Sequence, residues 1–254
     1  MSSTVAVLMC AYNSESFIRE AIESILGQTY RDFEFIIIEN GSTDSTWDII
    51  QSYADPRIRA FRTPLQQLTF NLNFGLVQTE ADYIARMDAD DIAEPTRIAR
   101  QVEYLDAHPD VAVLGTAFEF FGADRRPRTV ILPTTDNVIR RRLPFRFVIS
   151  HPTVMFRRSI VLGRGGYGGG RFCQDFDLWL RLARDRTIGF ANIDEPLLRY
   201  RIHSPQAKGR RECYAFVAGY LLRESLIQRS PRLFVGCVFS LLKVGVSLAS
   251  SWGK

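Results

Sequence analysis

Lysine is almost absent from this chain of 254 residues, which carries its positive charge on arginine. Only Lys208, Lys243 and Lys254 are lysines, whereas lysine and arginine together number 32. The planar guanidinium suits phosphates and diphosphates, although a codon bias of the genome would give the same composition. The arginine clusters lack interleaved aromatic residues and any nucleic-acid motif, which excludes nucleic acid as the expected partner and leaves solvated faces or anionic lipid. These clusters are residues 125–128, 140–142 and 210–211.

The cysteines show no paired spacing. Cys10, Cys173, Cys213 and Cys237 are scattered, with no Cys-X-X-Cys pair and no histidine at ligand spacing. The sequence therefore predicts neither a disulfide framework nor a zinc site, and it favours a reducing compartment. The N-terminus has no basic stretch, and its first apolar run has the length of a strand, so we expect no signal peptide.

Two enzyme signatures are also missing. No Gly-X-Gly-X-X-Gly follows the first apolar run, which argues against a dinucleotide-dependent dehydrogenase. No Asp-X-Asp follows that run either, where a phosphatase of the haloacid dehalogenase type would need one. The remaining composition, 46% hydrophobic and 24% charged, is typical of a globular protein and gives no sign of disorder.

Short apolar runs alternate with amphipathic stretches through the first half of the chain. Between the first two runs, Ile18, Ile22 and Ile25 recur at helical spacing. Such repetition predicts an α/β fold with a mostly parallel central sheet and helices on both faces. The second half is less regular and becomes helical after residue 211. We expect strands at residues 5–10, 33–38, 58–61, 83–87, 111–121 and 197–201, and helices at 18–26, 45–50, 71–77, 95–105 and 175–183.

Three carboxylates, Asp88, Asp90 and Asp91, follow the strand expected at residues 83–87. Ligands of open α/β sheets bind beyond the carboxyl ends of strands. Carboxylates so close repel one another, and their burial is unfavourable unless a cation or hydrogen-bond donors compensate. A Mg²⁺ or Mn²⁺ ion would do so, because such hard cations bind one or two carboxylates together with substrate phosphates. An acidic cap before the helix that begins near Pro95 is the alternative.

Seven segments, in chain order, resemble the sequence blocks of family 2 glycosyltransferases. The clearest is Tyr-Ile-Ala-Arg-Met-Asp-Ala-Asp-Asp at residues 83–91, and Leu-Asn-Phe-Gly at 72–75 is another. One such block alone is a weak signal, whereas seven in order over residues 4–205 are specific. The seven segments are 5–13, 37–44, 72–76, 83–91, 151–157, 175–181 and 197–203.

This resemblance implies a Rossmann-like single domain of the GT-A type. It also implies inverting transfer of a sugar from a nucleotide-diphosphate donor, UDP-sugar by default, to a glycan or lipid-linked acceptor in surface polysaccharide biosynthesis. Asp90 would bind the Mn²⁺ or Mg²⁺ ion that bridges the diphosphate. Processive polymer synthesis is not expected, because a Gln-X-X-Arg-Trp motif and multiple spanning helices are absent. The residues implied for the nucleotide-sugar are Ala11, Tyr12, Asn13, Glu39, Asn73, Asp88 and Arg201.

An inverting transfer needs a base that takes the proton of the acceptor hydroxyl. By resemblance this base is Asp175, which follows Gln174 where the family usually has glutamate. Asp175 and Asp177 would equally serve as caps of the helix that follows, and we favour catalysis for Asp175 and a structural role for Asp177. A second departure, Glu39-Asn40 in place of two aspartates, leaves the donor nucleobase open.

Two histidines are further candidates, and the C-terminal segment is the last feature. His151 and His203 would bind acceptor or phosphate, or fill structural positions. Residues 233–248 are strongly apolar but too short and interrupted to span a membrane. With Arg223, Arg229 and Arg232 before them, they favour a helix lying on the inner face of the cytoplasmic membrane, a core or dimer helix being the alternative.

The sequence therefore predicts a glycosyltransferase domain at residues 1–210 and a helical extension at 211–254. A rival interpretation is a catalytically inactive, membrane-associated scaffold of the same fold. Three departures from the family pattern, at Glu39, Asn40 and Gln174, motivate this rival. The intact Asp88, Asp90 and Asp175 argue against it.

Overall fold

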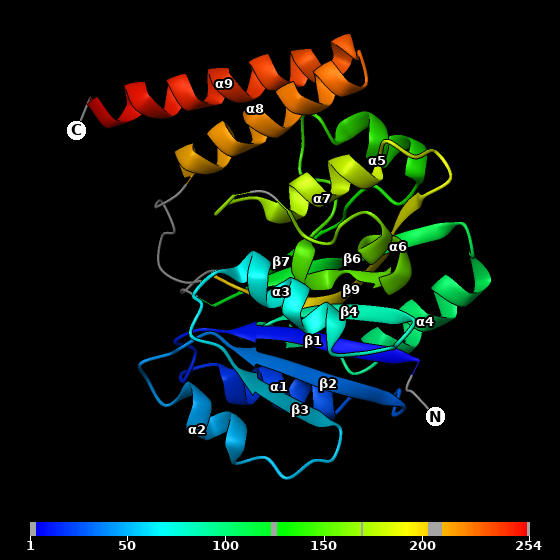
Figure 1. The fold of residues 1–254 in the computed structure, drawn as a ribbon, viewed down its shortest axis with the longest axis vertical. Coiled ribbons are helices and arrows are strands. Elements are labelled where there is room, and N and C mark those ends of the chain that lie inside the picture. The colour runs from blue at the N-terminus through cyan, green and yellow to red at the C-terminus, as the bar shows by residue number, and fades with distance from the viewer. Residues whose placement is uncertain (1–3, 123–125, 169, 203–209, 253–254) are drawn as a thin grey trace.

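The structure is a computed structural model that describes residues 4–122, 126–168, 170–202 and 210–252 (Figure 1). Within these residues, nine strands form one sheet in the order β3-β2-β1-β4-β8-β6-β9-β5, and β7 pairs with β6 beside that path. All strands expected from the sequence are present. The strands are β1 (Val5–Ala11), β2 (Phe33–Glu39), β3 (Ile58–Arg62), β4 (Tyr83–Asp88), β5 (Ile92–Ala93), β6 (Val111–Phe121), β7 (Arg128–Val130), β8 (Met155–Arg157) and β9 (Gly189–Arg201).

The first half of the sheet is parallel and the second half is mixed. β1 runs parallel to β2 and β4, and β2 runs parallel to β3, so the carboxyl ends of these strands share one edge. β8 runs antiparallel to both β4 and β6, whereas β6 and β9 are parallel. The expectation of a mostly parallel sheet is thus correct for the first half only. β8 has 3 residues, too few for a hydrophobic pattern to reveal.

Helices cover both faces of the sheet, as the alternating pattern predicted. The expected helices are present with boundaries shifted by a few residues, and short helices α5 and α6 were not expected. The helices are α1 (Ile18–Leu26), α2 (Thr46–Gln51), α3 (Leu68–Val77), α4 (Arg97–Ala107), α5 (Asp136–Arg142), α6 (Arg158–Gly163), α7 (Gln174–Leu182), α8 (Arg210–Ile227) and α9 (Pro231–Trp252), with a short 3-10 helix, η1 (His151–Thr153).

Two hydrophobic cores lie on opposite faces of the sheet because successive side chains of each strand alternate between the faces. Leu8 and Ile36 point into one core with α3, α5, α7 and α8. Val7 and Phe35 point into the other with α1 and α4. Burial on both faces explains why these strands appear in the sequence as unbroken apolar runs.

The C-terminal helices α8 and α9 lie side by side above α7, away from β1 and β2 (Figure 1). Their inner face is part of the first core, since Leu221 and Leu233 are buried there. No helix within the described residues is long and apolar enough to cross a membrane. The outer face of α9 is exposed and apolar; its large side chains are Phe234, Val235, Val238, Phe239, Leu241 and Leu242. The segment therefore packs on the core with one face and presents an apolar surface with the other.

Candidate active site

The loops that follow β1 and β2 are fastened together at the carboxyl edge of the parallel strands. The backbone N–H of Asn13 donates to Oγ of Ser42 at 3.0 Å, and Oδ1 of Asn13 accepts the N–H of Thr43 at 2.9 Å. Asn13 has a φ of 46°, in the left-handed region that asparagine tolerates better than most residues. Ala11 is buried and Tyr12 is exposed at the same corner. Three of the predicted donor-binding residues are thus brought together.

Glu39, another predicted donor contact, is buried at the end of β2. One of its carboxylate oxygens accepts the N–H of Ser42. The other lies 2.8 Å from Nε of Arg62, on β3 directly opposite Glu39 in the parallel register. The guanidinium of Arg62 lies over Trp47 and is half exposed. The charge of Glu39 is therefore compensated from within, and this corner presents a cation and an aromatic ring to solvent.

The three predicted carboxylates gather after β4. Ligand oxygens of Asp88, Asp90 and Asp91 all lie within 4.8 Å of one another. Residues 88–91 form an acidic turn, which Arg201 at the end of β9 holds in place. The N–H of Arg201 donates to Oδ1 of Asp91 at 2.8 Å, and its Nε donates to the carbonyl of Asp90 at 2.8 Å. The guanidinium of Arg201 also pairs with Glu20. Arg201, predicted to contact the nucleotide-sugar, thus supports the acidic turn in this structure.

The carboxylate cluster fits a divalent cation. Oδ2 of Asp91 is buried and has no hydrogen-bond partner among the described residues. Burial, followed by the negative charge of Asp88, raises the pKa of Asp91 to about 8. An unpaired carboxylate oxygen in such surroundings is unfavourable without a compensating charge. Carboxylate oxygens are the ligands that Mg²⁺ and Mn²⁺ prefer, so the donor set suits either ion.

Arg86 is a residue of the site for which no role was predicted. It shares with Asp88 the face of β4 that points toward α7, it is buried, and its guanidinium pairs with Asp88. Burial alone would lower the pKa of Arg86, but the charge and hydrogen bond of Asp88 raise it above its ordinary value. Nε and Nη1 of Arg86 have no partner among the described residues. An arginine inside an otherwise apolar strand was the signal available in the sequence.

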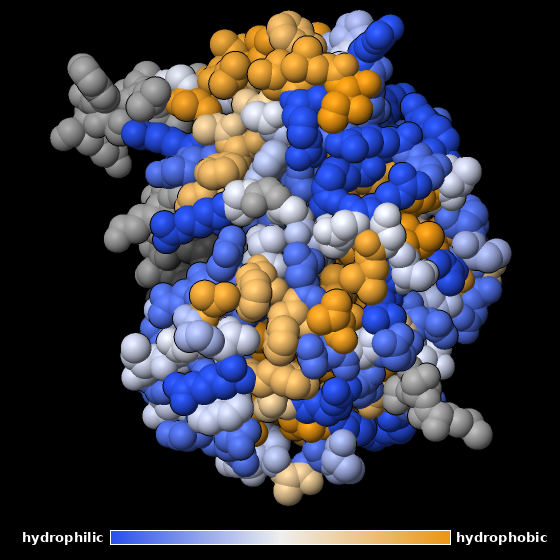
Figure 2. Space-filling view, in the orientation of Figure 1, coloured by the Kyte–Doolittle hydropathy of each residue, from blue (hydrophilic) through white to orange (hydrophobic). Residues whose placement is uncertain are grey.

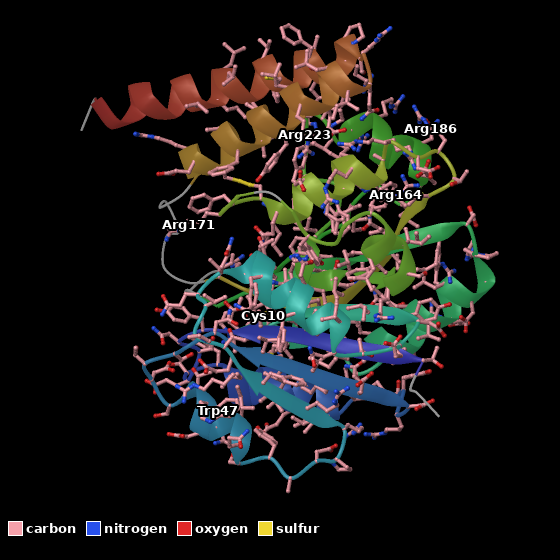
Figure 3. All side chains as sticks on the ribbon, viewed as in Figure 1. Cys10, Trp47, Arg164, Arg171, Arg186 and Arg223 are labelled. Atoms are coloured by element: carbon pink, nitrogen blue, oxygen red, sulfur yellow. A yellow bond between two sulfur atoms is a disulfide. The ribbon has the colours of Figure 1, made fainter. Side chains whose placement is uncertain are left out.

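Asp175 lies in the first turn of α7, and its neighbour Asp177 has a different environment. Cys173, not an aspartate, is the N-cap of this helix. Asp177 is buried and pairs with Arg181 at 2.8 Å and with Arg223 of α8 at 2.6 Å, so it joins two helices. Figure 3 labels Arg223 between α8 and α7. Asp175 has no ion pair with any described residue. Burial raises the pKa of Asp175, while the N–H of Phe176 and the charge of Arg86 oppose this.

Asp88 and Asp175 line one cavity of about 630 Å³. Its floor comes from β4 and α7, and its other walls come from residues 143–152 and from α8 and α9. Arg86 and Tyr200 also face it. Ligand pockets commonly have volumes of roughly 300–1,000 Å³. The cavity can therefore hold a sugar between the acidic turn and Asp175.

Two predicted ligand-binding residues are occupied with structural contacts. Nδ2 of Asn73 donates to the carbonyl of Tyr167 at 2.8 Å, and its Oδ1 accepts the N–H of Tyr167 at 2.8 Å. Nε2 of His151 lies 2.9 Å from Oη of Tyr167. Burial, followed by the charge of Arg86, lowers the pKa of His151 well below 6.5, so its ring is neutral. These contacts favour the structural interpretation of His151. His203 lies outside the described residues.

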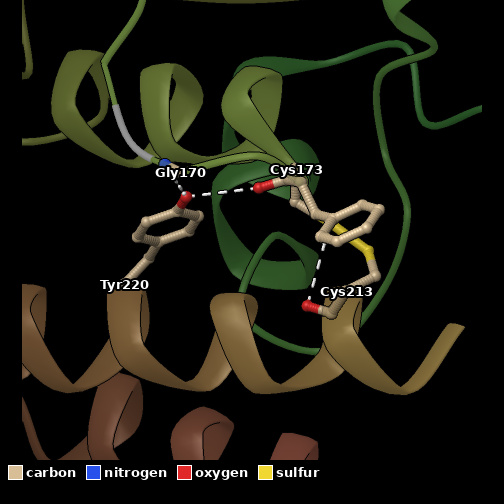
Figure 4. The surroundings of a disulfide bond; sticks show 5 residues. Gly170, Cys173, Cys213 and Tyr220 are labelled. Carbon is tan, nitrogen blue, oxygen red and sulfur yellow. Dashed lines mark hydrogen bonds between the residues drawn. A yellow bond between two sulfur atoms is a disulfide. The ribbon is translucent and has the colours of Figure 1, made fainter. Parts of the chain in front are cut away.

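Cys173 and Cys213 form a disulfide, which corrects the expectation that no cysteines pair (Figure 4). The pairing escapes sequence spacing because α8 folds back over the first turn of α7 and brings together residues 40 positions apart. Oη of Tyr220, also on α8, accepts the N–H of Gly170 at 2.7 Å and donates to the carbonyl of Phe172 at 3.2 Å. The disulfide and Tyr220 thus fasten α8 to the segment that leads to Asp175.

The sequence model of glycosyl transferase family 2 matches residues 6–162. An O-antigen biosynthesis glycosyltransferase of Escherichia coli, WbnJ, is 33% identical over 245 residues, covering 94% of this chain and 95% of WbnJ. A UDP-Gal:alpha-D-GlcNAc-diphosphoundecaprenol beta-1,3-galactosyltransferase of the same species is 30% identical over 215 residues, 81% of this chain and 76% of the relative. The chain belongs to glycosyltransferase family 2.

Solved structures agree with the fold. Residues 1–349 of TarS from S. aureus in complex with UDP superpose with a TM-score of 0.67 at 18% identity, over 86% of this chain and 65% of that structure. The chain thus spans slightly less than two thirds of that structure's length. The mannosyltransferase PcManGT of Pyrobaculum calidifontis, in complex with GDP-Man and Mn²⁺, gives a TM-score of 0.66 at 16% identity, over 100% of this chain and 76% of that structure. The protein is accordingly a glycosyltransferase with a mixed α/β fold of the GT-A type.

Proposed function

We propose that this chain is an inverting, metal-dependent transferase that moves a sugar from a UDP-sugar to a hydroxyl of a glycan or lipid-linked acceptor in surface polysaccharide biosynthesis. The observation that supports the proposal most is that Asp88 of the acidic turn and Asp175 line the same cavity. A relative that uses a UDP-sugar, a relative in O-antigen biosynthesis and a neighbour in complex with UDP support the donor and the pathway.

Asp90, with Asp88 and Asp91 beside it, would hold Mn²⁺ or Mg²⁺. Bound there, the ion would neutralise negative charge on the diphosphate that leaves. The mannosyltransferase structure with Mn²⁺ supports the choice of ion. Arg201 keeps the turn in its shape through contacts with Asp90 and Asp91 that involve no ligand.

Asp175 acts as the base. The acceptor oxygen forms a bond with the anomeric carbon as the bond from that carbon to the diphosphate breaks, and the proton of the hydroxyl passes to the carboxylate. The nucleoside diphosphate leaves with the electron pair of the broken bond. Burial raises the pKa of Asp175, which makes its carboxylate a better proton acceptor than that of an ordinary aspartate. Attack opposite the leaving group inverts the anomeric centre.

The corner formed by Ala11, Tyr12, Asn13 and Glu39 binds the nucleoside. Tyr12 is exposed and offers a ring on which a base can stack. The carboxylate of Glu39 is already paired with Arg62, so base recognition here includes the guanidinium as well as the acid.

The exposed face of α9 rests on a membrane surface. Figure 2 shows apolar side chains gathered over this helix, and α8 adds Leu222, Leu226 and Ile227. Arg229 is exposed at the turn between the helices, whereas Arg223, expected to contact lipid, is paired with Asp177 and Glu224. The absence of paired cysteine spacing was the argument for a reducing, cytoplasmic setting. The disulfide between Cys173 and Cys213 removes this argument. Deleting α9 should move the protein from the membrane fraction to the supernatant; an unchanged distribution would contradict this placement.

The experiment that tests the function is calorimetric titration with UDP, with and without Mn²⁺, followed by an assay of UDP-sugar hydrolysis. The proposal expects binding that requires Mn²⁺ and slow release of sugar. Asp82→Ala, an exposed aspartate at the opposite end of β4, serves as the control and should bind UDP as the wild type does. Metal-dependent binding without any hydrolysis or transfer would favour the inactive scaffold instead.

A further inference from the structure

The cavity of Asp88 and Asp175 continues toward the outside of the molecule along α9. A second hollow of about 610 Å³ adjoins it and shares with it Phe145, Arg146, Phe147 and Lys243. Phe239 of α9 completes the lining of this second hollow. The two hollows together form a channel that begins at the proposed reaction centre and opens beside the exposed apolar face of α9.

The channel contains two cations that no acid of the described residues neutralises. Lys243 is half-buried and Arg146 is exposed, and neither has an ion pair with any described residue. Nζ of Lys243 lies 4.4 Å from the centre of the Phe239 ring, a contact that keeps the charge beside an apolar surface. Two uncompensated cations on one channel favour an anionic ligand.

The same stretch of the channel is lined by aromatic rings. Phe147 is 60% exposed and Phe239 is 41% exposed, although large apolar side chains gain free energy by burial. The rings of Phe145 and Phe239 lie 6.2 Å apart at 70°, so they form one surface across the two walls of the channel. A purely hydrophilic glycan would leave these rings in contact with water, whereas a hydrocarbon chain would cover them.

We propose that this channel binds an acceptor in which a phosphate or diphosphate joins the sugar to a hydrocarbon chain. The proposal rests on the transferase function proposed above. The sugar hydroxyl lies at Asp175, the phosphates lie between Arg146 and Lys243, and the first units of the chain lie across Phe147 and Phe239. The rest of the chain continues along the apolar face of α9 toward the lipid. Asp175 lines the inner hollow alone, the two cations line both hollows, and Phe239 lines the outer hollow alone, which is the order that such a molecule requires.

Calorimetry with three small probes tests the channel in wild-type protein saturated with UDP and Mn²⁺. The probes are farnesyl diphosphate, inorganic pyrophosphate and farnesol. The proposal expects farnesyl diphosphate to bind at least about tenfold more tightly than either of the others, because only this probe contacts cations and rings together.

Three channel variants separate the contribution of the diphosphate end of the probe from that of its hydrocarbon end. Arg146→Gln and Lys243→Gln should each weaken farnesyl diphosphate about tenfold and leave farnesol unchanged, as expected for loss of one charge-assisted contact. Phe239→Ala should weaken farnesyl diphosphate and leave pyrophosphate unchanged. The matched controls are Arg142→Gln and Phe70→Ala, both exposed and outside the channel, which should behave as wild type.

Several outcomes would contradict the proposal that the channel binds such an acceptor. Equal affinity for pyrophosphate and farnesyl diphosphate would leave only an anion site, and displacement of UDP by farnesyl diphosphate would place the probe in the donor site. Unchanged affinity in all three channel variants would mean that the probe binds elsewhere. UDP affinity, measured on every variant, verifies folding. Absence of Mn²⁺-dependent UDP binding or of hydrolysis in the wild type would reject the transferase function without rejecting the channel.

Discussion

The donor side and the acceptor side of the cavity are built in different ways. On the donor side, the acidic turn and the loops with Asn13 and Glu39 follow strands that are parallel and buried on both faces. On the acceptor side, Asp175 is surrounded by residues 143–152, α8 and α9, none of which contributes a strand. That side is held by cross-links between distant segments, namely the disulfide and the ion pairs of Asp177 and Glu224.

Because of this difference, we expect substitutions on the donor side to affect function and substitutions on the acceptor side to affect stability. Side chains at the ends of the parallel strands are positioned by a ladder of backbone hydrogen bonds, so replacing one of them should remove its function and leave the fold intact. Side chains that cross-link α7 and α8 are themselves the framework, so replacing one should destabilise the acceptor side first. Four changes and one pH profile test this contrast, from the largest expected effect to the smallest.

Asp90→Ala should abolish Mn²⁺-dependent binding of UDP, because it removes the main proposed metal ligand. Thermal unfolding without ligand should be nearly unchanged, since the backbone carbonyl of Asp90 still accepts from Arg201. Calorimetry and a melting curve decide between the two effects. A variant that unfolds at much lower temperature would break the proposed contrast on the donor side.

Asp175→Asn should lower kcat by about 10²–10⁴-fold, because the amide cannot accept the acceptor's proton. The dissociation constant of UDP should stay within a few-fold of wild type, because Asp175 lies at the start of α7, whereas the proposed nucleoside contacts follow β1 and β2. Transfer at a wild-type rate would show that the base is another residue, and Asp177 would be tested next.

Asp177→Asn should destabilise the protein by about 3 kcal/mol, the lower end of the cost of breaking a buried ion pair, because Arg223 is 37% exposed. Urea unfolding measures the effect. The matched control is Glu80→Gln, which breaks the exposed pair with Arg158 and should cost less than about 1 kcal/mol. Equal losses in both variants would contradict the framework role of Asp177.

Cys213→Ser should cost about 2–4 kcal/mol, the usual effect of losing a disulfide, and should act on the acceptor side alone. Reduction of the wild type by dithiothreitol should give a similar loss. Cys237→Ser, at a buried cysteine without a disulfide partner, controls for the loss of the sulfur atom. If UDP affinity falls as far as acceptor affinity, the two sides are not independent.

The pH dependence gives the smallest effect. Burial raises the pKa of Asp175 above its ordinary value of 3.8, and the base works only when it is ionised. As the pH falls, kcat should therefore decline at a higher pH than an ordinary aspartate would cause. A pH profile of kcat at saturating donor shows this limb, and its absence from Asp175→Asn would assign it to this group.

The sequence predicted the donor side far better than the acceptor side, for a physical reason. Strands such as Val5–Ala11 and Tyr83–Asp88 are recognised from local hydrophobic runs, and the edge rule then places Asp88 and Asp90 near Asn13. The pairs Cys173–Cys213 and Asp177–Arg223 join helices far apart in the chain, and no local period records them.

The contacts of individual side chains could not be predicted from the sequence. The resemblance assigned Asn73 and Arg201 to the nucleotide-sugar, whereas their hydrogen bonds to Tyr167 and to the acidic turn depend on three-dimensional packing. Arg86 was overlooked because its importance follows from burial beside Asp88, which a sequence does not state.

The two hydrogen bonds between Asn73 and Tyr167 limit how this sequence can change during evolution. Gly166, just before Tyr167, has a φ of 63°, and a Cβ there would collide with Oδ1 of Asn73. A side chain at position 166 would therefore strain the backbone and push away the amide that holds the next residue. The residue at position 73, about ninety residues earlier, therefore depends on the residue at position 166. We expect substitutions at these two positions to occur together.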